Sequence, residues 1–248
     1  MRIARIQTTS GIKTAVAQRD LWAVIEDPYA VEVLYTGEVF PIEGASLMCP
    51  FIPRNIIGIS QNLTNNDHPL PLQAWYKATQ TAAGPGDQIK LREDIGDITI
   101  EGELAVVIGK QGIGLTAENA FDFVLGYTVV NDVTNVTQVP IDERFFQAKA
   151  GINYTPFGPW IETELANPDD VAIEVDINGE RVASSGSFNL PSNVATTIAY
   201  VASWVTLEPG DVILTGAPKT FAPVKPGDVV TITMPGIGSL TNMVGRVA

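Results

Sequence analysis

The chain has 248 residues and a formal net charge of −13, with 15 Lys and Arg residues against 28 Asp and Glu residues. This acidic balance argues against binding to nucleic acid or to an anionic membrane surface, because both attract basic proteins. Apolar residues make up 45% of the chain, enough for a sizeable core, yet no apolar run reaches the roughly 18 residues of a membrane span. Because the N-terminus also lacks the apolar stretch of a signal peptide, we expect a cytoplasmic protein.

Short apolar runs rich in β-branched residues recur along the chain and are bounded by Gly, Pro, Asp or Asn, a pattern typical of strands. A Pro-Gly-Asp tripeptide occurs three times, and Pro followed by Gly suits a type II turn that starts the next strand. The predicted strands cover residues 1–7, 56–59, 104–108, 127–130, 171–177, 212–214 and 229–233, and the turns cover 85–87, 209–211 and 226–228.

Two segments are expected to be helical. Thr116 is the predicted cap of a short helix over 117–124, and a second helix is predicted over about 192–206. In the second, apolar residues recur at helical spacing after Ser192 or Asn193, either of which suits an N-cap. Few helices among many strands predict a mainly β fold with some α (α+β).

The organisation of the chain changes near a proline-bounded segment, Cys49-Pro50-Phe51-Ile52-Pro53. We interpret residues 1–52 as a small β-rich N-terminal subdomain and residues 53–248 as the main domain. The single cysteine excludes an internal disulfide and a zinc site built on several cysteines.

Two glutamates stand close together in the stretch 100–109. Glu101 and Glu103 share one face of the predicted strand, Gly102 leaves room for close approach on the other face, and the apolar residues 104–108 lead into the core. Two carboxylates at the start of a buried strand need compensation for their charge, and a hard divalent cation supplies it simply. The alternative is a strand end at the surface with two solvated glutamates.

A third carboxylate, Asp132, follows the next predicted strand. Three carboxylates, completed by water or substrate oxygens, form the octahedral oxygen site that suits Mg²⁺ or Mn²⁺. Alternatively, Asp132 only starts a turn, which is common after strands.

Taken together, several motifs resemble the fumarylacetoacetate hydrolase family from about residue 53 to the C-terminus, in particular its isomerase/decarboxylase members of the 2-hydroxyhepta-2,4-diene-1,7-dioate and 5-oxopent-3-ene-1,2,5-tricarboxylate type and its acylpyruvate hydrolases. The motifs are Glu-x-Glu-Leu-Ala-Val-Val-Ile-Gly-Lys from residue 101, Gly-Tyr-Thr and Asn-Asp-Val-Thr within 126–134, Lys149, Phe-Gly-Pro-Trp at 157–160, Leu-Glu-Pro-Gly-Asp-Val-Ile-Leu-Thr-Gly at 207–216 and Gly-Ile-Gly-Ser-Leu-Thr-Asn at 236–242.

The resemblance implies a mixed β-roll or barrel-like catalytic domain, a homodimer, and a divalent metal with a 2-oxo or enol acid as substrate. We expect Mg²⁺ or Mn²⁺, with Ca²⁺ as a further candidate. The exposed-looking aromatic residues at 157–160 also suggest a surface that a second copy covers. By position, the resemblance implies metal ligands Glu101, Glu103 and Asp132, catalytic residues Lys149 and Thr215, and substrate contacts Gln138 and Lys77.

Two of these lysines have plainer interpretations. Lys149 can stabilise the negative charge of an enolate, or it is a solvated surface lysine. Lys77, in Trp75-Tyr76-Lys77, lies beside the site or packs its stem against aromatic neighbours. Five aromatic residues either shape the substrate pocket or belong to the core, namely Trp75, Tyr76, Phe145, Phe146 and Tyr154.

The sequence departs from the hydrolytic members, which the resemblance implies carry Asn-Tyr-x-x-His-x-x-Glu after an early strand. Aligned without a gap, Asn62 matches the Asn, but Asn66 and Pro69 stand where the His and Glu activate water. His68 is the only histidine, and it either takes the catalytic role after a shift of the loop 61–72 or is an incidental loop residue. Arg144 is the candidate to replace a family arginine missing from 135–137, and Ala217 stands where Thr is usual.

We therefore expect a divalent-metal-dependent enzyme that acts on 2-oxo or enol (β-dicarbonyl) carboxylic acids in aromatic or carboxylic acid catabolism. Decarboxylation or enol–keto isomerisation through a metal-stabilised enolate is favoured, because hydrolysis needs an activated water and a base. The first alternative is a carbon–carbon bond hydrolase of acylpyruvates. The second is a catalytically silent relative that binds a metal or a ligand.

Overall fold

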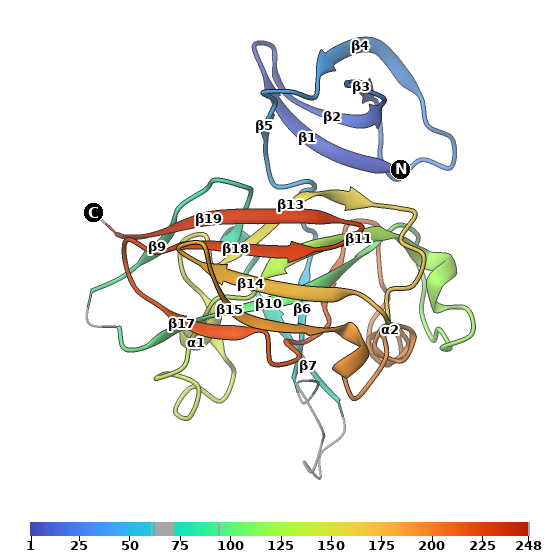
Figure 1. Ribbon diagram of the computed structural model, residues 1–248. Helices are drawn as coiled ribbons and strands as arrows, with labels where there is room; N and C mark the ends of the chain where they lie inside the picture. Colours follow the sequence, from blue (N-terminus) through green and yellow to red (C-terminus); the bar gives the residue numbers. More distant parts are fainter. Residues whose placement is uncertain (61, 63–71, 94, 248) are drawn as a thin grey trace.

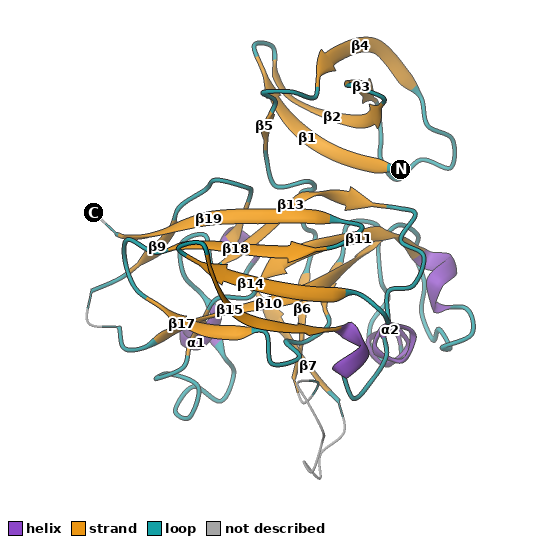
Figure 2. Cartoon of the chain, viewed as in Figure 1, coloured by secondary structure: helices purple, strands orange, loops and turns teal. Residues whose placement is uncertain are grey.

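The structure, a computed structural model, describes residues 1–60, 62, 72–93 and 95–247 (Figure 1). Strands dominate it, and its helices are short (Figure 2). This mainly β architecture of mixed sheets confirms the predicted α+β fold class. Among the described residues, no helix is long and apolar enough to cross a membrane.

The described strands form two sheets that pack against each other. The larger sheet holds, in spatial order, β4 (Tyr35–Pro41), β3 (Leu21–Ile25), β2 (Gly11–Gln18), β1 (Arg2–Thr8), β13 (Thr155–Glu162), β11 (Val124–Asn131), β10 (Ile98–Ile108), β16 (Val212–Leu214), β6 (Ile56–Ser60) and β7 (Gln73–Lys77), with β5 (Ser46–Leu47), β8 (Ala82–Ala83), β12 (Thr134–Asn135) and β17 (Phe221–Val224) at branches. The second sheet holds β15 (Glu180–Gly186), β14 (Ala172–Ile177), β18 (Val229–Met234), β19 (Gly238–Arg246) and β9 (Ile89–Leu91).

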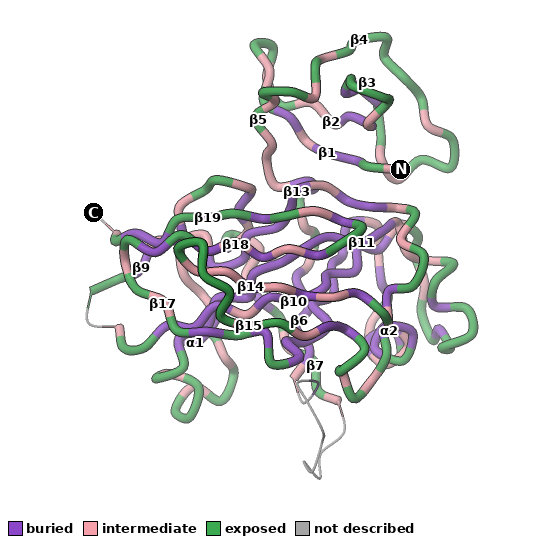
Figure 3. Tube along the Cα trace, viewed as in Figure 1, coloured by how far each residue is buried: buried purple, intermediate pink, exposed green. Residues whose placement is uncertain are grey.

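The burial of the strands explains their sequence patterns (Figure 3). β10 is buried along nearly its whole length, so its apolar residues form a continuous run. β18 has one face toward the core, and buried Val230, Ile232 and Met234 alternate with partly or fully exposed residues. The absent side chain of Gly102 lets the second sheet approach β10, because a Cβ there would lie 3.1 Å from Ile232.

All seven predicted strands are present, and the three Pro-Gly-Asp turns precede β9, β16 and β18 as expected. The turn glycines Gly86, Gly210 and Gly227 have φ values of 80°, 89° and 99°, which a type II turn requires at this position. Each turn aspartate accepts a hydrogen bond from a backbone N–H three residues earlier in the chain.

One of the two predicted helices is confirmed, although it ends at Ala202 rather than near residue 206, and the other is wrong. The helix α2 (Val194–Ala202) begins after Asn193, whose side chain accepts the N–H of Thr196. Residues 117–124 instead form turns and a short 3₁₀ helix (Ala120–Phe123). The side chain of Asn119 accepts the N–H of Thr116, and this local hydrogen bond favours a turn over a helix.

The N-terminal strands continue the larger sheet. β1 pairs with β13 through Arg2 opposite Glu162 and Ile3 opposite Ile161. Strands β1 to β5 also enclose an apolar cluster of their own around Trp22. Figure 1 shows this unit at one end of the molecule, over β13. The division at residue 52 stays a prediction.

The prediction that the aromatic residues at 157–160 are exposed is wrong. Phe157 is fully buried, and its ring centroid lies 5.1 Å from that of Phe51. Trp160 is half-buried, with its ring centroid 6.5 Å from that of Trp22 in the N-terminal unit. These residues pack within one chain, so they give no argument for a second copy.

The buried turn aspartate Asp211 provides a test of this fold. Its two oxygens accept hydrogen bonds from the Asn55 side chain at 2.7 Å and the Glu208 N–H at 2.8 Å. We expect Asp211→Ala to lower the free energy of unfolding by about 3 kcal/mol, because two donors to a buried charge lose their acceptor. Urea unfolding followed by circular dichroism measures this loss. The exposed Glu180→Ala control should change the value by less than about 0.5 kcal/mol, and an equally small effect of Asp211→Ala would contradict the prediction.

Candidate metal centre

The strand β10 changes its neighbours on both sides within a few residues. On one edge it pairs with β11 from Gly102 to Ile108 and with β12 at Ile98 and Thr99. On the other edge it pairs with β16 near its C-terminal end and with β17 near its N-terminal end. The sheet therefore opens around Glu101 and Glu103, whose side chains share one face of the strand.

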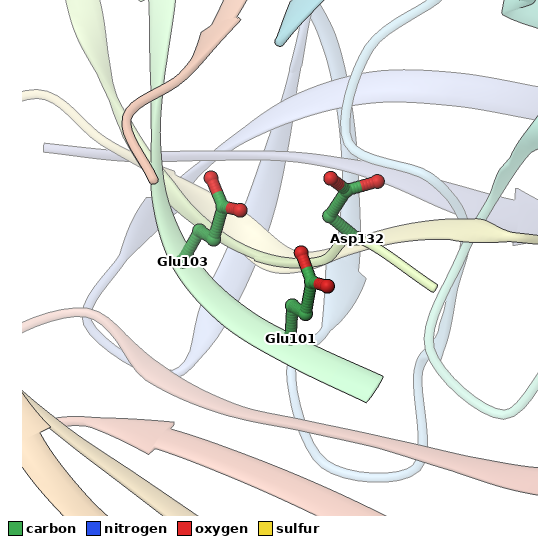
Figure 4. Close-up of side chains that lie close together, drawn as sticks. All are labelled: Glu101, Glu103 and Asp132. Atoms are coloured by element: carbon green, nitrogen blue, oxygen red, sulfur yellow. The ribbon is translucent and has the colours of Figure 1, made fainter. Parts of the chain in front are cut away.

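Asp132 directly follows β11 and reaches the same opening. Its N–H donates to the carbonyl of Glu101 at 2.9 Å, which fixes the end of β11 beside β10. The carboxylates of Glu101, Glu103 and Asp132 each offer an oxygen within 4.8 Å of the others, as Figure 4 illustrates. Glu103 and Asp132 are buried, and Glu101 is partly exposed. The structure thus brings the three predicted metal ligands together; we call them the carboxylate cluster.

A backbone turn between β16 and β17 holds Glu103 in place. The N–H of Gly216 donates to its Oε2 at 2.6 Å. Gly216 has a φ of 106°, and a Cβ there would lie 2.2 Å from the carbonyl oxygen of Asn62. The buried side chain of Asn62 donates in turn to the carbonyls of Thr215 and Ser192 and accepts the Ser192 N–H. This network fixes the turn that positions Glu103.

Lys149 lies against the carboxylate cluster, at the end of the short helix α1 (Phe146–Lys149). Its ammonium donates to Glu101 at 3.1 Å, to Asp132 at 2.5 Å and to the Thr134 hydroxyl at 2.6 Å. The side chain is 11% exposed, so it is not a solvated surface lysine.

Lys77 is a second cation that contacts the carboxylate cluster, and its side chain is fully buried. It donates to the carboxylate of Asp132 and to the carbonyls of Tyr154, at 2.9 Å, and Val133, at 3.3 Å. All three ammonium hydrogens therefore have acceptors within the protein. The predicted contact of Lys77 with a substrate would require one of these hydrogen bonds to be given up.

Burial and the neighbouring charges together shift the pKa values of the residues at the site. Burial opposes ionisation of Asp132, but the ammonium groups of Lys149 and Lys77 lower its pKa. Burial raises the pKa of Glu103, and the charges of Asp132 and Glu101 raise it further. Burial also disfavours the Lys149 ammonium, yet the carboxylates outweigh this effect and raise the pKa of Lys149. Burial lowers the pKa of Lys77, although Asp132 opposes the decrease.

The donor set fits a divalent cation. Three carboxylates offer hard oxygen ligands with enough negative charge for Mg²⁺ or Mn²⁺. Glu103 is the one member of the cluster without an ion pair among the described residues, so it gains most from a bound cation. Lys149 already places a positive charge beside the other two carboxylates.

The remaining predicted site residues lie in different places. The buried hydroxyl of Thr215 donates to the carbonyl of Leu104 at 2.9 Å, on the backbone of β10. Gln138 is half-buried and lines a cavity of about 260 Å³ with Phe146. Arg144 is exposed and lines another cavity of about 260 Å³. His68, Asn66, Pro69 and all but Asn62 and Leu72 of the predicted loop 61–72 lie outside the described residues.

The five aromatic residues singled out in the sequence lie in the core, on the surface or beside the carboxylate cluster. Tyr154 is buried in the core, whereas Tyr76 and Phe146 are exposed. Trp75 and Phe145 meet edge to face with ring centroids 5.8 Å apart. The Trp75 ring centroid also lies 5.1 Å from the Lys149 ammonium nitrogen, a contact that the sequence pattern did not indicate.

The buried position of Lys77 gives a stability prediction. We expect Lys77→Met to lower the free energy of unfolding of the metal-free protein by about 3–5 kcal/mol, because the buried Asp132 loses one of its charge partners. Urea unfolding in EDTA measures the effect. Lys225→Met, at an 82% exposed side chain, is the matched control and should change stability by less than about 0.5 kcal/mol. A Lys77→Met protein as stable as the wild type would show that Lys77 does not hold Asp132.

Comparison with known proteins identifies relatives along the whole chain. The family described as fumarylacetoacetate (FAA) hydrolase, C-terminal, matches residues 54–245, and a family described as Rv2993c-like, N-terminal, matches residues 1–50. Protein Rv2993c from Mycobacterium tuberculosis is 31% identical over 264 residues, covering 99% of this chain and 98% of its own length.

Two further relatives carry names that describe an activity. Oxaloacetate tautomerase YisK from Bacillus subtilis is 33% identical over 213 residues, covering 77% of this chain and 70% of its own length. The crystal structure of 5-carboxymethyl-2-hydroxymuconate delta-isomerase from Mycobacterium smegmatis matches with a TM-score of 0.93 and 33% identity, covering 100% of both chains.

Proposed function

The chain belongs to the fumarylacetoacetate hydrolase family, and on this premise we propose that it is a divalent-metal-dependent enzyme that isomerises or decarboxylates 2-oxo or enol carboxylic acids. Members of the family are enzymes, among them isomerases and hydrolases. The names of two relatives, an oxaloacetate tautomerase and a delta-isomerase, support enol–keto isomerisation. The enol forms of such acids are tautomers of the β-dicarbonyl acids expected from the sequence.

The observation that carries this proposal is the position of the Lys149 ammonium within hydrogen-bond distance of two of the three carboxylates. A divalent cation bound there would supply Lewis-acid chemistry toward the carboxylate and 2-oxo oxygens of the substrate. Lys149 adds a fixed positive charge beside the same position. An enol or enolate carries more negative charge than the 2-oxo acid, so this charge favours it.

The other residues of the site position these groups. Lys77 holds Asp132, and the N–H of Gly216 holds one oxygen of Glu103. Thr215 acts through the same turn, because its hydroxyl anchors the turn to β10. Lys149 acts on the substrate through its positive charge, and a hydrogen bond to a substrate oxygen would replace one of its present bonds to Glu101, Asp132 or Thr134. Its hydrogens already point to acidic and hydroxyl oxygens, so it does not act as a base in this arrangement.

Two of the remaining predicted residues are assigned to the substrate and to proton transfer. Arg144 lines a cavity that Trp75 also lines, and Trp75 contacts Lys149, so we assign Arg144 to a carboxylate at the far end of the substrate. Gln138 lines a separate cavity together with Phe146 and Gln147 of α1 and is assigned no contact with the substrate. His68 remains the candidate that moves a proton between carbon and oxygen.

The expected reactions differ in their need for water. Isomerisation moves a proton, and decarboxylation releases CO₂, so neither needs an attacking water. Hydrolysis of an acylpyruvate needs a base that activates water. Asn66 and Pro69, which stand where hydrolytic members carry His and Glu, provide no such base. This favours isomerisation or decarboxylation over carbon–carbon bond hydrolysis.

A substrate screen with Mg²⁺ and Mn²⁺ tests the proposal. We expect the protein to accelerate loss of the ultraviolet absorbance of enol oxaloacetate, and we expect EDTA or Glu103→Gln to abolish the effect. Lys149→Ala should lower kcat about 10²-fold, because it removes charge stabilisation of the enolate. Lys225→Ala is the control and should leave kcat unchanged.

Measured release of CO₂ from oxaloacetate would identify the protein as a decarboxylase. Cleavage of acylpyruvates would instead identify the hydrolase, and no turnover of any of these acids would contradict the proposal.

We also propose that the chain forms a homodimer, which rests on the family resemblance alone. Multi-angle light scattering at micromolar concentration should give about twice the chain mass of 26.5 kDa. A mass near that of one chain would refute the dimer.

A further inference from the structure

We propose that Trp75 is a positioning residue for Lys149, which holds the lysine ammonium at the carboxylate cluster through the face of its indole ring and holds the start of α1 through Phe145. The inference rests on the proposed function in one respect, since it presumes that the position of Lys149 matters for turnover. The contact itself is independent of that function.

The indole ring lies close enough to the ammonium for a cation–π interaction. The Nζ atom of Lys149 is 5.1 Å from the Trp75 ring centroid, within the distance of about 6 Å at which such contacts are favourable. The three hydrogens of Nζ are donated to Glu101, Asp132 and Thr134, so the ring adds contact on another side of the ammonium. With the side chain 11% exposed, little water weakens this attraction.

The pairing of β7 explains how Trp75 reaches the site. Trp75 stands opposite Gly58 in β6, and Lys77 stands opposite Ile56. Residues two apart in a strand share a face, so both side chains project toward the cluster. Lys77 contacts Asp132, and Trp75 contacts Lys149. The edge strand β7 thus contacts Asp132 through Lys77 and Lys149 through Trp75.

Gly58 provides the space that the indole needs. A Cβ at this position would lie 2.2 Å from Cζ2 of Trp75 and 2.3 Å from its Cε2. The ring therefore lies directly on the backbone of β6. Any side chain at Gly58 would push the indole away, which makes this glycine a means to move the ring without removing it.

Phe145 connects the same ring to the helix that carries Lys149. Its ring meets Trp75 edge to face, at 5.8 Å between centroids and 65° between planes. Phe145 has a φ of 59°, a left-handed conformation that is uncommon for a residue with a Cβ. The backbone N–H of Lys149 donates to the carbonyl of Phe145 at 2.9 Å. Packing of Phe145 on Trp75 therefore fixes the turn of helix from which Lys149 extends.

The indole ring matters because a bound cation would compete with Lys149 for two of its hydrogen-bond acceptors. A cation held by Glu101 and Asp132 would share their oxygens with the ammonium. The indole face and the Thr134 hydroxyl are the neighbours of Nζ that such a cation leaves unchanged. Trp75 thereby keeps the ammonium beside the site when the carboxylates have another partner.

Three variants test the inference, with two readouts. Trp75→Leu removes the aromatic face, Trp75→Phe keeps one, and Trp204→Leu is the matched control. Trp204 is 75% exposed and lines the same cavity of about 220 Å³ as Trp75, but it has no described contact with Lys149. The first readout is the acetylation rate of Lys149 in metal-free protein, measured by peptide mass spectrometry. The second is kcat and KM for oxaloacetate with Mg²⁺.

We expect Trp75→Leu to raise the acetylation rate about 10-fold and to lower kcat about 10-fold, with KM within about threefold of the wild type. Trp75→Phe should stay within about threefold in both readouts, and Trp204→Leu should match the wild type. Equal effects of Leu and Phe, or no effect of Leu, would overturn the inference. If the wild type turns over no substrate, the proposed function fails, but the acetylation rates still decide whether Trp75 holds Lys149.

A variant that retains the indole covers the case in which Trp75→Leu does not fold. Gly58→Ala displaces the ring by filling the space beneath it. We expect this variant to raise the acetylation rate of Lys149 about as much as Trp75→Leu, with Trp75 still present in the chain. An acetylation rate equal to that of the wild type in a folded Gly58→Ala protein would contradict the inference.

Discussion

The structure depends on the meeting of three carboxylates, two of them buried, at one point of the larger sheet, because this charge must be balanced by other parts of the chain. The balance comes from Lys77 on β7, from Lys149 on α1 and from the N–H of Gly216 between β16 and β17. These elements are far apart in sequence, and each places a hydrogen-bond donor against the same cluster. The cluster therefore both requires and organises the meeting of β7, α1, β11 and the turn after β16.

Apolar packing makes the opening in the sheet possible. β10 can exchange its neighbours around Glu101 because the second sheet covers it there, with Ile232, Val175 and Ile173 close to the bare backbone of Gly102. The polar face of the same short segment is thereby left to the carboxylates. A strand with a packed face and a charged face holds its carboxylates more rigidly than a surface loop would.

Part of this site follows from local sequence rules and part does not. Glu101 and Glu103 share a face because of the two-residue period of a strand, and Asp132 meets them because it directly follows the strand paired with theirs. Lys149 is identified only through the family resemblance, since the four-residue helix that carries it is too short to show helical periodicity. Its contact with Trp75 joins residues 74 positions apart, and the burial of Phe157 depends on packing against Phe51. The helix expected over 117–124 failed because the side chain of Asn119 forms a local turn instead.

Asn62 has a consequence for how this scaffold can change. Its buried side chain ties the chain to the turn that holds Glu103, directly before the positions at which this sequence carries Asn66 and Pro69 in place of a His–Glu pair. Beyond that anchor, the segment 63–71 contributes none of the three carboxylates. Because Asn62 is the anchor of the turn, the hydrogen bonds that position Glu103 set a limit on changes at residue 62 itself, where any other side chain would leave the carbonyl of Thr215 and the N–H of Ser192 without their partners.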